Sequence, residues 1–213
     1  MKRKFPLASA AAYLLPCRLL MIKRLIAMLA LLCACAFAQS LPSDSLVKGA
    51  WDLGLWTAGG HSVSGGTADT GVWNAGVRVG KVLTDEHGSG LLRGNLEYAV
   101  DFLPAYLLLF PRQTAYAGGL DPVILKWNFT GGRKVAPYLE FGGGVLFSLD
   151  DVPPGASNVN FMPQASFGVQ IFTRERRAIT VAARYVHISN AGLATPNPGI
   201  NTLQFAIGYQ WFK

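Results

Sequence analysis

The stretch Leu203-Gln-Phe-Ala-Ile-Gly-Tyr-Gln-Trp211, close to the end of the chain, decides the fold class, because large apolar residues occupy every second position. Strict alternation of this kind is typical of a β-strand with two different faces. The positions in between hold only Gln, Ala and Gly, which are small or polar. The stretch therefore predicts a strand with its large apolar and aromatic side chains on one face alone.

Seven further segments show the same alternation, at residues 51–56, 73–80, 92–102, 123–129, 138–147, 161–171 and 178–185. In each of them one face is apolar or aromatic and the other is small or polar. A narrow eight-stranded barrel has room inside for small side chains and ion pairs, and large aromatics then belong on the lipid side. We expect residues 39–213 to form an all-β domain, an eight-stranded antiparallel transmembrane β-barrel of the outer membrane.

Charged residues lie on the small and polar face of several predicted strands. Because a barrel of this size is filled by its own side chains, we interpret these charges as structural filling rather than as catalytic groups, and a narrow pore is disfavoured. The expected interior charges are Arg78, Arg93, Glu97, Asp101, Lys126, Glu140 and Arg184.

The connections between the predicted strands alternate in length. Outer-membrane barrels have long extracellular loops and short periplasmic turns, which predicts both termini on the periplasmic side. The final alternating run also looks like the terminal strand of such barrels, although Lys213 follows its aromatic residues. The expected long connections are 59–71, 103–120, 148–160 and 190–200, and the short ones are 84–90, 130–134 and 173–177.

Residues 1–38 read as a secretion leader. A basic segment from Met21 to Arg24 precedes an apolar run from Leu25 to Phe37, and an A-x-A cleavage site ends at Ala38, so the mature chain is expected to begin at Gln39. Translation from Met1 or from Met21 stays open. The lipobox-like run Leu32-Cys33-Ala34-Cys35 leaves a lipoprotein as an alternative.

The cysteines and the net charge exclude several classes of function. All three cysteines lie in the leader, so the mature chain has no disulfide, and we expect no metal and no cofactor. The formal charge of +7 is also misleading. Six of the 19 basic residues belong to the leader and all 12 acidic residues follow position 40, which leaves 13 against 12, or about +1. Nucleic acid is therefore not an expected partner.

Polar residues break the apolar face near the end of the seventh predicted strand. His187 and Ser189 are two residues apart, so they lie on the same face of the strand with their Cα atoms about 6.6 Å apart. Asn201, on the eighth strand, falls on the same outer face. Polar side chains on a lipid-facing surface are costly and tend to be functional. The alternative is that all three lie at the headgroup level, where polar residues are tolerated.

The segment His187-x-Ser189-Asn190-Ala-Gly192, followed by Pro-Asn197-x-Gly, resembles the lipid A 3-O-deacylase family, the PagL-type acyloxyacyl hydrolases. The resemblance implies an outer-membrane esterase that removes the 3-hydroxyacyl chain at the 3-position of lipid A. It implies Ser189 as nucleophile, His187 as general base and Asn197 as an oxyanion donor, with Asn190 and Gly192 in support. The implied partner is lipopolysaccharide in the outer leaflet. The oligomeric state stays open, a dimer being one alternative.

The chain departs from the family at one position, because Asn201 stands where the family has a Glu that completes the triad. An amide can orient an imidazole but cannot stabilise the imidazolium with a full charge. Three interpretations follow: a slow enzyme, an alignment shifted by a residue, or a barrel that has lost the reaction. The second hypothesis for the whole chain is accordingly a catalytically silent small barrel with a structural or adhesive role.

Overall fold

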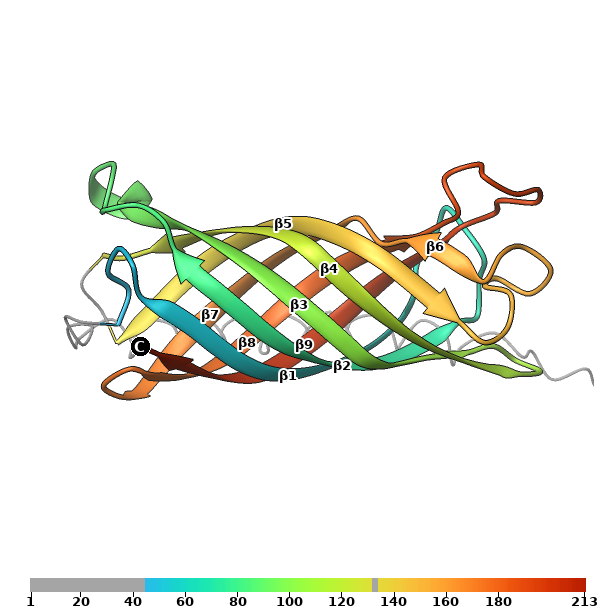
Figure 1. The fold of residues 1–213 in the computed structure, drawn as a ribbon, viewed down its shortest axis with the longest axis horizontal. Helices are drawn as coiled ribbons and strands as arrows, with labels where there is room; N and C mark the ends of the chain where they lie inside the picture. The colour runs from blue at the N-terminus through green and yellow to red at the C-terminus, as the bar shows by residue number, and fades with distance from the viewer. Residues whose placement is uncertain (1–44, 132–133) are drawn as a thin grey trace, which may run out of the picture. The chain divides into compact units, whose positions relative to one another are not determined.

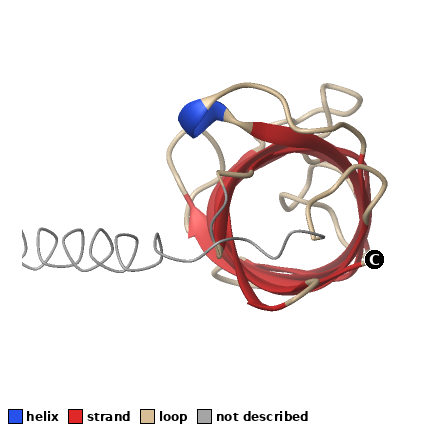
Figure 2. Ribbon diagram, turned by 90° about the vertical axis from the view of Figure 1, so that its left-hand side faces the viewer, coloured by secondary structure: helices blue, strands red, loops and turns tan. Residues whose placement is uncertain are grey.

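The computed structural model describes residues 45–131 and 134–213, which form a closed antiparallel β-barrel (Figures 1 and 2). Its strands are β1 (Trp51–Ser62), β2 (Gly71–Val82), β3 (Gly94–Leu109), β4 (Thr114–Phe129), β5 (Val135–Ser148), β6 (Val159–Phe161), β7 (Gln164–Arg174), β8 (Arg177–Ile188) and β9 (Ile200–Phe212). A short 3-10 helix, η1 (Gly90–Leu92), precedes β3. The predicted leader, with its cleavage site and alternative starts, lies outside the described residues.

Eight strands close the barrel, as the sequence predicts. Each pairs with its neighbour in the chain, the first strand β1 pairs with the last strand β9, and β4 pairs with β5. The three-residue β6 is an addition that pairs with the far end of β5. In lipid every backbone N–H and C=O needs a partner within the protein, and this closure supplies one along every barrel strand. Among the described residues, no helix has the length and apolar character needed to cross a membrane.

The two faces of the strands follow the predicted alternation. Large apolar side chains such as Phe102, Phe141 and Phe205 are more than half exposed on the outside. The positions between them point into the barrel and are buried. This arrangement is the reverse of a soluble protein and matches a barrel whose outer surface lies in lipid.

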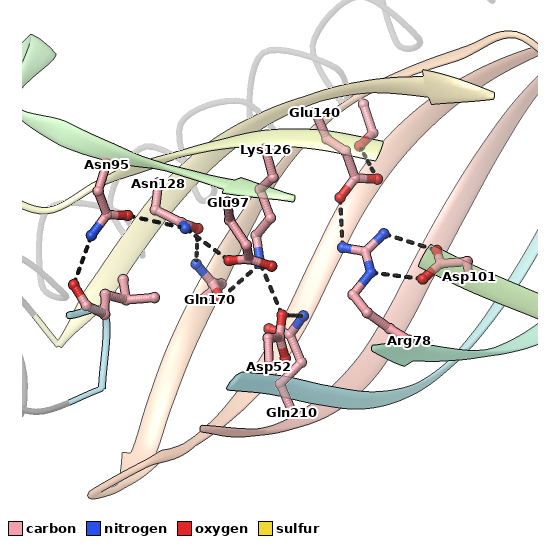
Figure 3. Close-up of polar contacts among 12 residues, drawn as sticks. Asp52, Arg78, Asn95, Glu97, Asp101, Lys126, Asn128, Glu140, Gln170 and Gln210 are labelled. Carbon is pink, nitrogen blue, oxygen red and sulfur yellow. Dashed lines mark hydrogen bonds and ion pairs between the residues drawn. The ribbon is translucent and has the colours of Figure 1, made fainter. Parts of the chain in front are cut away.

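The interior contains two groups of buried charges (Figure 3). Arg78 forms ion pairs with Asp101 at 2.8 Å and with Glu140 at 2.6 Å. Lys126 Nζ lies 3.2 Å from both Asp52 and Glu97. An internal cavity of about 20 Å³ beside Arg78 and Glu140 has room for about one water molecule, so side chains fill this part of the barrel.

One predicted interior charge is wrong. Arg93 belongs to the turn before β3, where its exposed guanidinium pairs with Glu86. The alternating pattern starts at Gly94 rather than at residue 92, so Arg93 has no place on the inner face. Asp52 and Asp121, which were not in the expected network, are buried inside instead.

The predicted long connection at 103–120 is also wrong, because β3 and β4 continue far beyond the expected strand ends. They form an extended hairpin whose connecting turn is only residues 110–113. Register shifts at Leu103–Tyr106 accommodate Pro104, which cannot donate a ladder hydrogen bond. Leu108 and Ala115 are buried in this extension, whereas Leu109 and Tyr116 are exposed.

Candidate active site

The three polar residues singled out on the outer face meet at the end of the barrel opposite the C-terminus. His187 on β8 is directly opposite Asn201 on β9 in the strand register. Ser189 follows β8 immediately, and its backbone is bridged to Phe161 of β6 by hydrogen bonds of 2.7 and 3.1 Å. Strand pairing on both sides therefore fixes the positions of all three residues.

Their side chains form a hydrogen-bonded chain. Ser189 Oγ lies 2.9 Å from His187 Nε2, and His187 Nδ1 lies 2.6 Å from Asn201 Oδ1. In a Ser-His triad, one ring nitrogen of the histidine bonds the serine hydroxyl and the other donates to an acceptor side chain. The three residues have this arrangement. Asn201 thus occupies the third position of this chain of hydrogen bonds. In the described parts of the chain, no carboxylate forms an ion pair with His187.

The Asn201 amide can have only one orientation. Its Nδ2 donates to the backbone carbonyl of Ser64 at 3.2 Å, and a carbonyl oxygen can only accept. Oδ1 must then face the ring, so Nδ1 of His187 carries the proton and donates it. Nε2 is left as the acceptor for the Ser189 hydroxyl, which is the tautomer that a general base requires.

The loop between β1 and β2 holds this amide in place. Backbone hydrogen bonds join Val63 N to Asn201 O at 2.7 Å and Thr67 N to Gly199 O at 2.8 Å. Gly65 has φ +101°, and a Cβ there would lie 2.8 Å from Asn201 Nδ2. The loop covers the site, so that Asn201 is only 8% exposed although it belongs to the outer face.

The loop between β8 and β9 contains the predicted oxyanion residue. Asn197 Oδ1 accepts a hydrogen bond of 3.1 Å from the backbone N–H of Asn190. The Asn190 side chain in turn bonds the carbonyls of Ala194 and Pro196 and accepts from the N–H of Gly192 at 2.9 Å. Asn190 and Gly192 therefore brace the loop, and the amide nitrogen of Asn197 faces away from Asn190 N–H.

Several residues of the site were missed in the sequence. Ser64 and Gly65 hold Asn201, Pro163 O accepts from the His187 backbone at 3.0 Å, and a Cβ on Gly199 would lie 3.0 Å from His187 Cε1. A glycine in a loop is a weak signal, because many loop glycines serve only the turn. Gly199, with φ +65°, was detectable only through its place in the Pro-Asn-x-Gly segment.

Comparison with known proteins identifies the family of the chain. The family model for lipid A 3-O-deacylase (PagL) matches residues 52–210, which is most of the barrel. The chain belongs to this family. No curated protein sequence matches it.

Solved structures of outer-membrane proteins share the architecture. The crystal structure of the outer membrane enzyme PagL superposes with a TM-score of 0.55 at 18% identity, covering 74% of this chain and 97% of that one. Neisserial surface protein A follows with a TM-score of 0.49 at 14% identity, covering 76% and 95%. OprG from Pseudomonas aeruginosa has a TM-score of 0.48 at 10% identity, covering 80% and 98%. The family match and the fold shared with the PagL structure identify an outer-membrane β-barrel.

Proposed function

We propose that this chain is an outer-membrane esterase that removes the 3-hydroxyacyl chain from the 3-position of lipid A. The observation that carries the proposal is the Ser189–His187–Asn201 chain of hydrogen bonds on the outer face of the barrel. A substrate that is itself a membrane lipid can reach such a site by lateral diffusion in the outer leaflet, with its acyl chains beside the apolar outer surface of the strands.

The proposed reaction is acyl transfer to serine followed by hydrolysis. His187 Nε2 takes the hydroxyl proton of Ser189 as Oγ attacks the ester carbonyl, and the same proton then passes to the leaving 3-hydroxyl of the glucosamine. Asn197 is suited to bind the oxyanion through its amide nitrogen, because its Oδ1 is already engaged by Asn190 N–H. Water then attacks the acyl-serine, again with His187 as the base, and releases the free 3-hydroxy acid.

Asn201 is compatible with this role because of its orientation. In serine proteases, an Asp-to-Asn change at the third position lowers kcat by about 10⁴, because the imidazole is left in the wrong tautomer. Here the Ser64 carbonyl turns the amide nitrogen away from the ring, and the correct tautomer is kept. What the amide lacks is the negative charge that would stabilise the imidazolium, so we expect a slower enzyme rather than a silent one.

The test is the mass spectrum of lipid A from a Gram-negative host that expresses the full-length protein. The proposal predicts loss of one 3-hydroxyacyl mass, which is absent when Ser189→Ala is expressed at the same level. An unchanged spectrum with the native protein folded in the outer membrane would contradict it. That outcome would favour the alternative of a catalytically silent barrel with a structural or adhesive role. The observation that supports this alternative is Asn201, which stands where the family has an acidic residue.

A further inference from the structure

The outer face carries a second distinctive surface at the opposite end of the barrel, on the adjacent strands β2, β1, β9 and β8. Trp51 is opposite Lys81 in the strand register, and Trp211 is opposite Arg177. Trp51 also exchanges backbone hydrogen bonds of 2.7 and 2.9 Å with Lys213. Three cations and two tryptophans therefore lie close together on four adjacent strands at the end of the barrel that holds the C-terminus, and we call this set the basic row: Lys81, Trp51, Lys213, Trp211 and Arg177.

Two other cations at this end of the barrel are neutralised by carboxylates, unlike those of the basic row. Lys48 pairs with Asp85 and Arg93 pairs with Glu86. Within the described residues, Lys81, Lys213 and Arg177 form no ion pair, and all three are exposed. Lys81 Nζ lies 4.9 Å from the centre of the Trp51 ring, which holds the cation against the barrel. The row thus presents positive charge that nothing in the described chain neutralises.

A shallow apolar groove begins next to the basic row, on the membrane side of it. It is open rather than enclosed, and its volume is about 420 Å³. Ile179 is two residues from Arg177 and Tyr209 is two residues from Trp211, so the groove starts about 6.6 Å from Arg177 along β8. The residues that line it are Leu55, Trp56, Thr57, Ile179, Ile207, Gly208 and Tyr209.

Figure 1 places the C-terminus at the opposite end of the barrel from β6, and β6 is bridged to Ser189 of the candidate site. If the site faces the outer leaflet, then the groove and the basic row lie in the inner leaflet, which consists of phospholipid. A phospholipid has its phosphate at the membrane boundary and its acyl chains further into the membrane. The cations at the boundary and the apolar groove on their membrane side match this arrangement.

We propose that the basic row and the groove together bind one anionic phospholipid of the inner leaflet. The phosphate contacts Arg177 and Lys213, Lys81 adds positive charge from β2 beside Trp51, the glycerol lies beside Trp211 and Tyr209, and one acyl chain occupies the groove. Trp211 and Tyr209 pack edge to face with their ring centres 4.7 Å apart, and they mark the boundary between the polar and apolar parts of the site. The site is separate from the candidate active site and does not depend on its activity.

Native mass spectrometry of the full-length protein in detergent tests this, with added phosphatidylglycerol or phosphatidylcholine of identical acyl chains. We expect about tenfold greater retention of phosphatidylglycerol, since cations near a membrane surface attract anionic headgroups. The combined variant Lys81→Gln, Arg177→Gln and Lys213→Gln should lose this preference. The control Lys48→Gln with Arg93→Gln, at the same end but in existing ion pairs, should keep it.

A second variant tests the groove independently of charge. Ile179→Trp fills the groove, so it should reduce retention of both phospholipids, while the heat-dependent gel shift of the folded barrel stays unchanged. Equal retention of the two phospholipids by the native protein would overturn the proposal. Loss of the preference in the Lys48 and Arg93 control, or displacement of phosphatidylglycerol by an equal amount of lipid A, would overturn it as well.

Discussion

The barrel contains two polar regions, one on the inner face of β1 to β5 and one on the outer face of β8 and β9. Inside, Lys126 is fully buried, and its ammonium lies 3.2 Å from carboxylates of β1 and β3. Outside, His187 and Ser189 interrupt an apolar surface and are held by strand ends and loops at one end of the barrel. Under the proposed function, the inner polar residues stabilise the barrel and the outer ones carry the reaction.

The largest effect is expected at the outer region. His187→Ala should lower the rate of lipid A deacylation by about 10²–10⁴-fold, because the general base is lost. The folded barrel should be as stable as before, since the hydrogen bonds of the imidazole join it to Ser189 and Asn201 of the site. Release of 3-hydroxy acid by the purified protein measures the rate, and urea unfolding followed by tryptophan fluorescence measures stability. If the variant lost stability to an extent that explained its lower rate, then the role of His187 would be structural.

The interior should behave in the opposite way. Lys126→Met leaves Asp52 and Glu97 buried without their cation, which should lower the free energy of unfolding by roughly 3–5 kcal/mol. Deacylation per folded molecule should stay unchanged, because Lys126 lies on the inner face and the site on the outer. Urea unfolding in the same detergent gives the first quantity. A drop in the rate of the folded fraction would show that the two regions are coupled.

Substitutions at Asn201 distinguish two explanations of how this residue affects the rate, one based on its missing charge and one based on its orientation by Ser64. If only charge is missing, then Asn201→Asp should raise the rate. We expect instead a fall of about tenfold, because one carboxylate oxygen would face the Ser64 carbonyl, which now accepts a hydrogen bond from the amide. Asn201→Ala should be slower still. The measurement is the rate of 3-hydroxy acid release at saturating lipid A, and an Asn201→Asp or Asn201→Glu protein faster than the native one would refute the role given to Ser64.

The smallest effect concerns the loop packed on the imidazole. Gly199→Ala adds a Cβ 3.0 Å from His187 Cε1, so the ring must shift and the rate should fall by a few-fold to about tenfold. Gly155→Ala is the matched control: Gly155 also has positive φ, at +79°, but a Cβ there meets nothing within 4 Å. Both variants should lose similar stability, and only Gly199→Ala should lose activity. Equal rates would show that Gly199 does not position the ring.

Much of the fold was predictable because a period of two is a strong signal. The eight barrel strands, their two faces and the shared face of His187, Ser189 and Asn201 all follow from counting alternate positions. Counting fails where the alternation is broken. Pro104 and the bulges around it conceal the extension of β3 and β4, and Arg93 lies one residue before its strand begins.

The support of the site was not predictable for a different reason. Ser64 and Asn201 are 137 residues apart in the chain, and they meet only because the barrel closes between β1 and β9. The contact uses a backbone carbonyl, which any residue at position 64 would supply. No side-chain pattern can reveal such a partner, whereas the residues that carry the resemblance to the deacylase family lie within one short segment.

The most direct test of the account measures deacylation and stability together in Ser189→Ala and Lys126→Met, purified and folded in the same detergent with lipid A as substrate. The account predicts that Ser189→Ala releases no 3-hydroxy acid above background yet unfolds at the native urea concentration. It predicts that Lys126→Met unfolds earlier yet keeps the native rate per folded molecule. A Ser189→Ala protein that still deacylates lipid A would contradict the central claim.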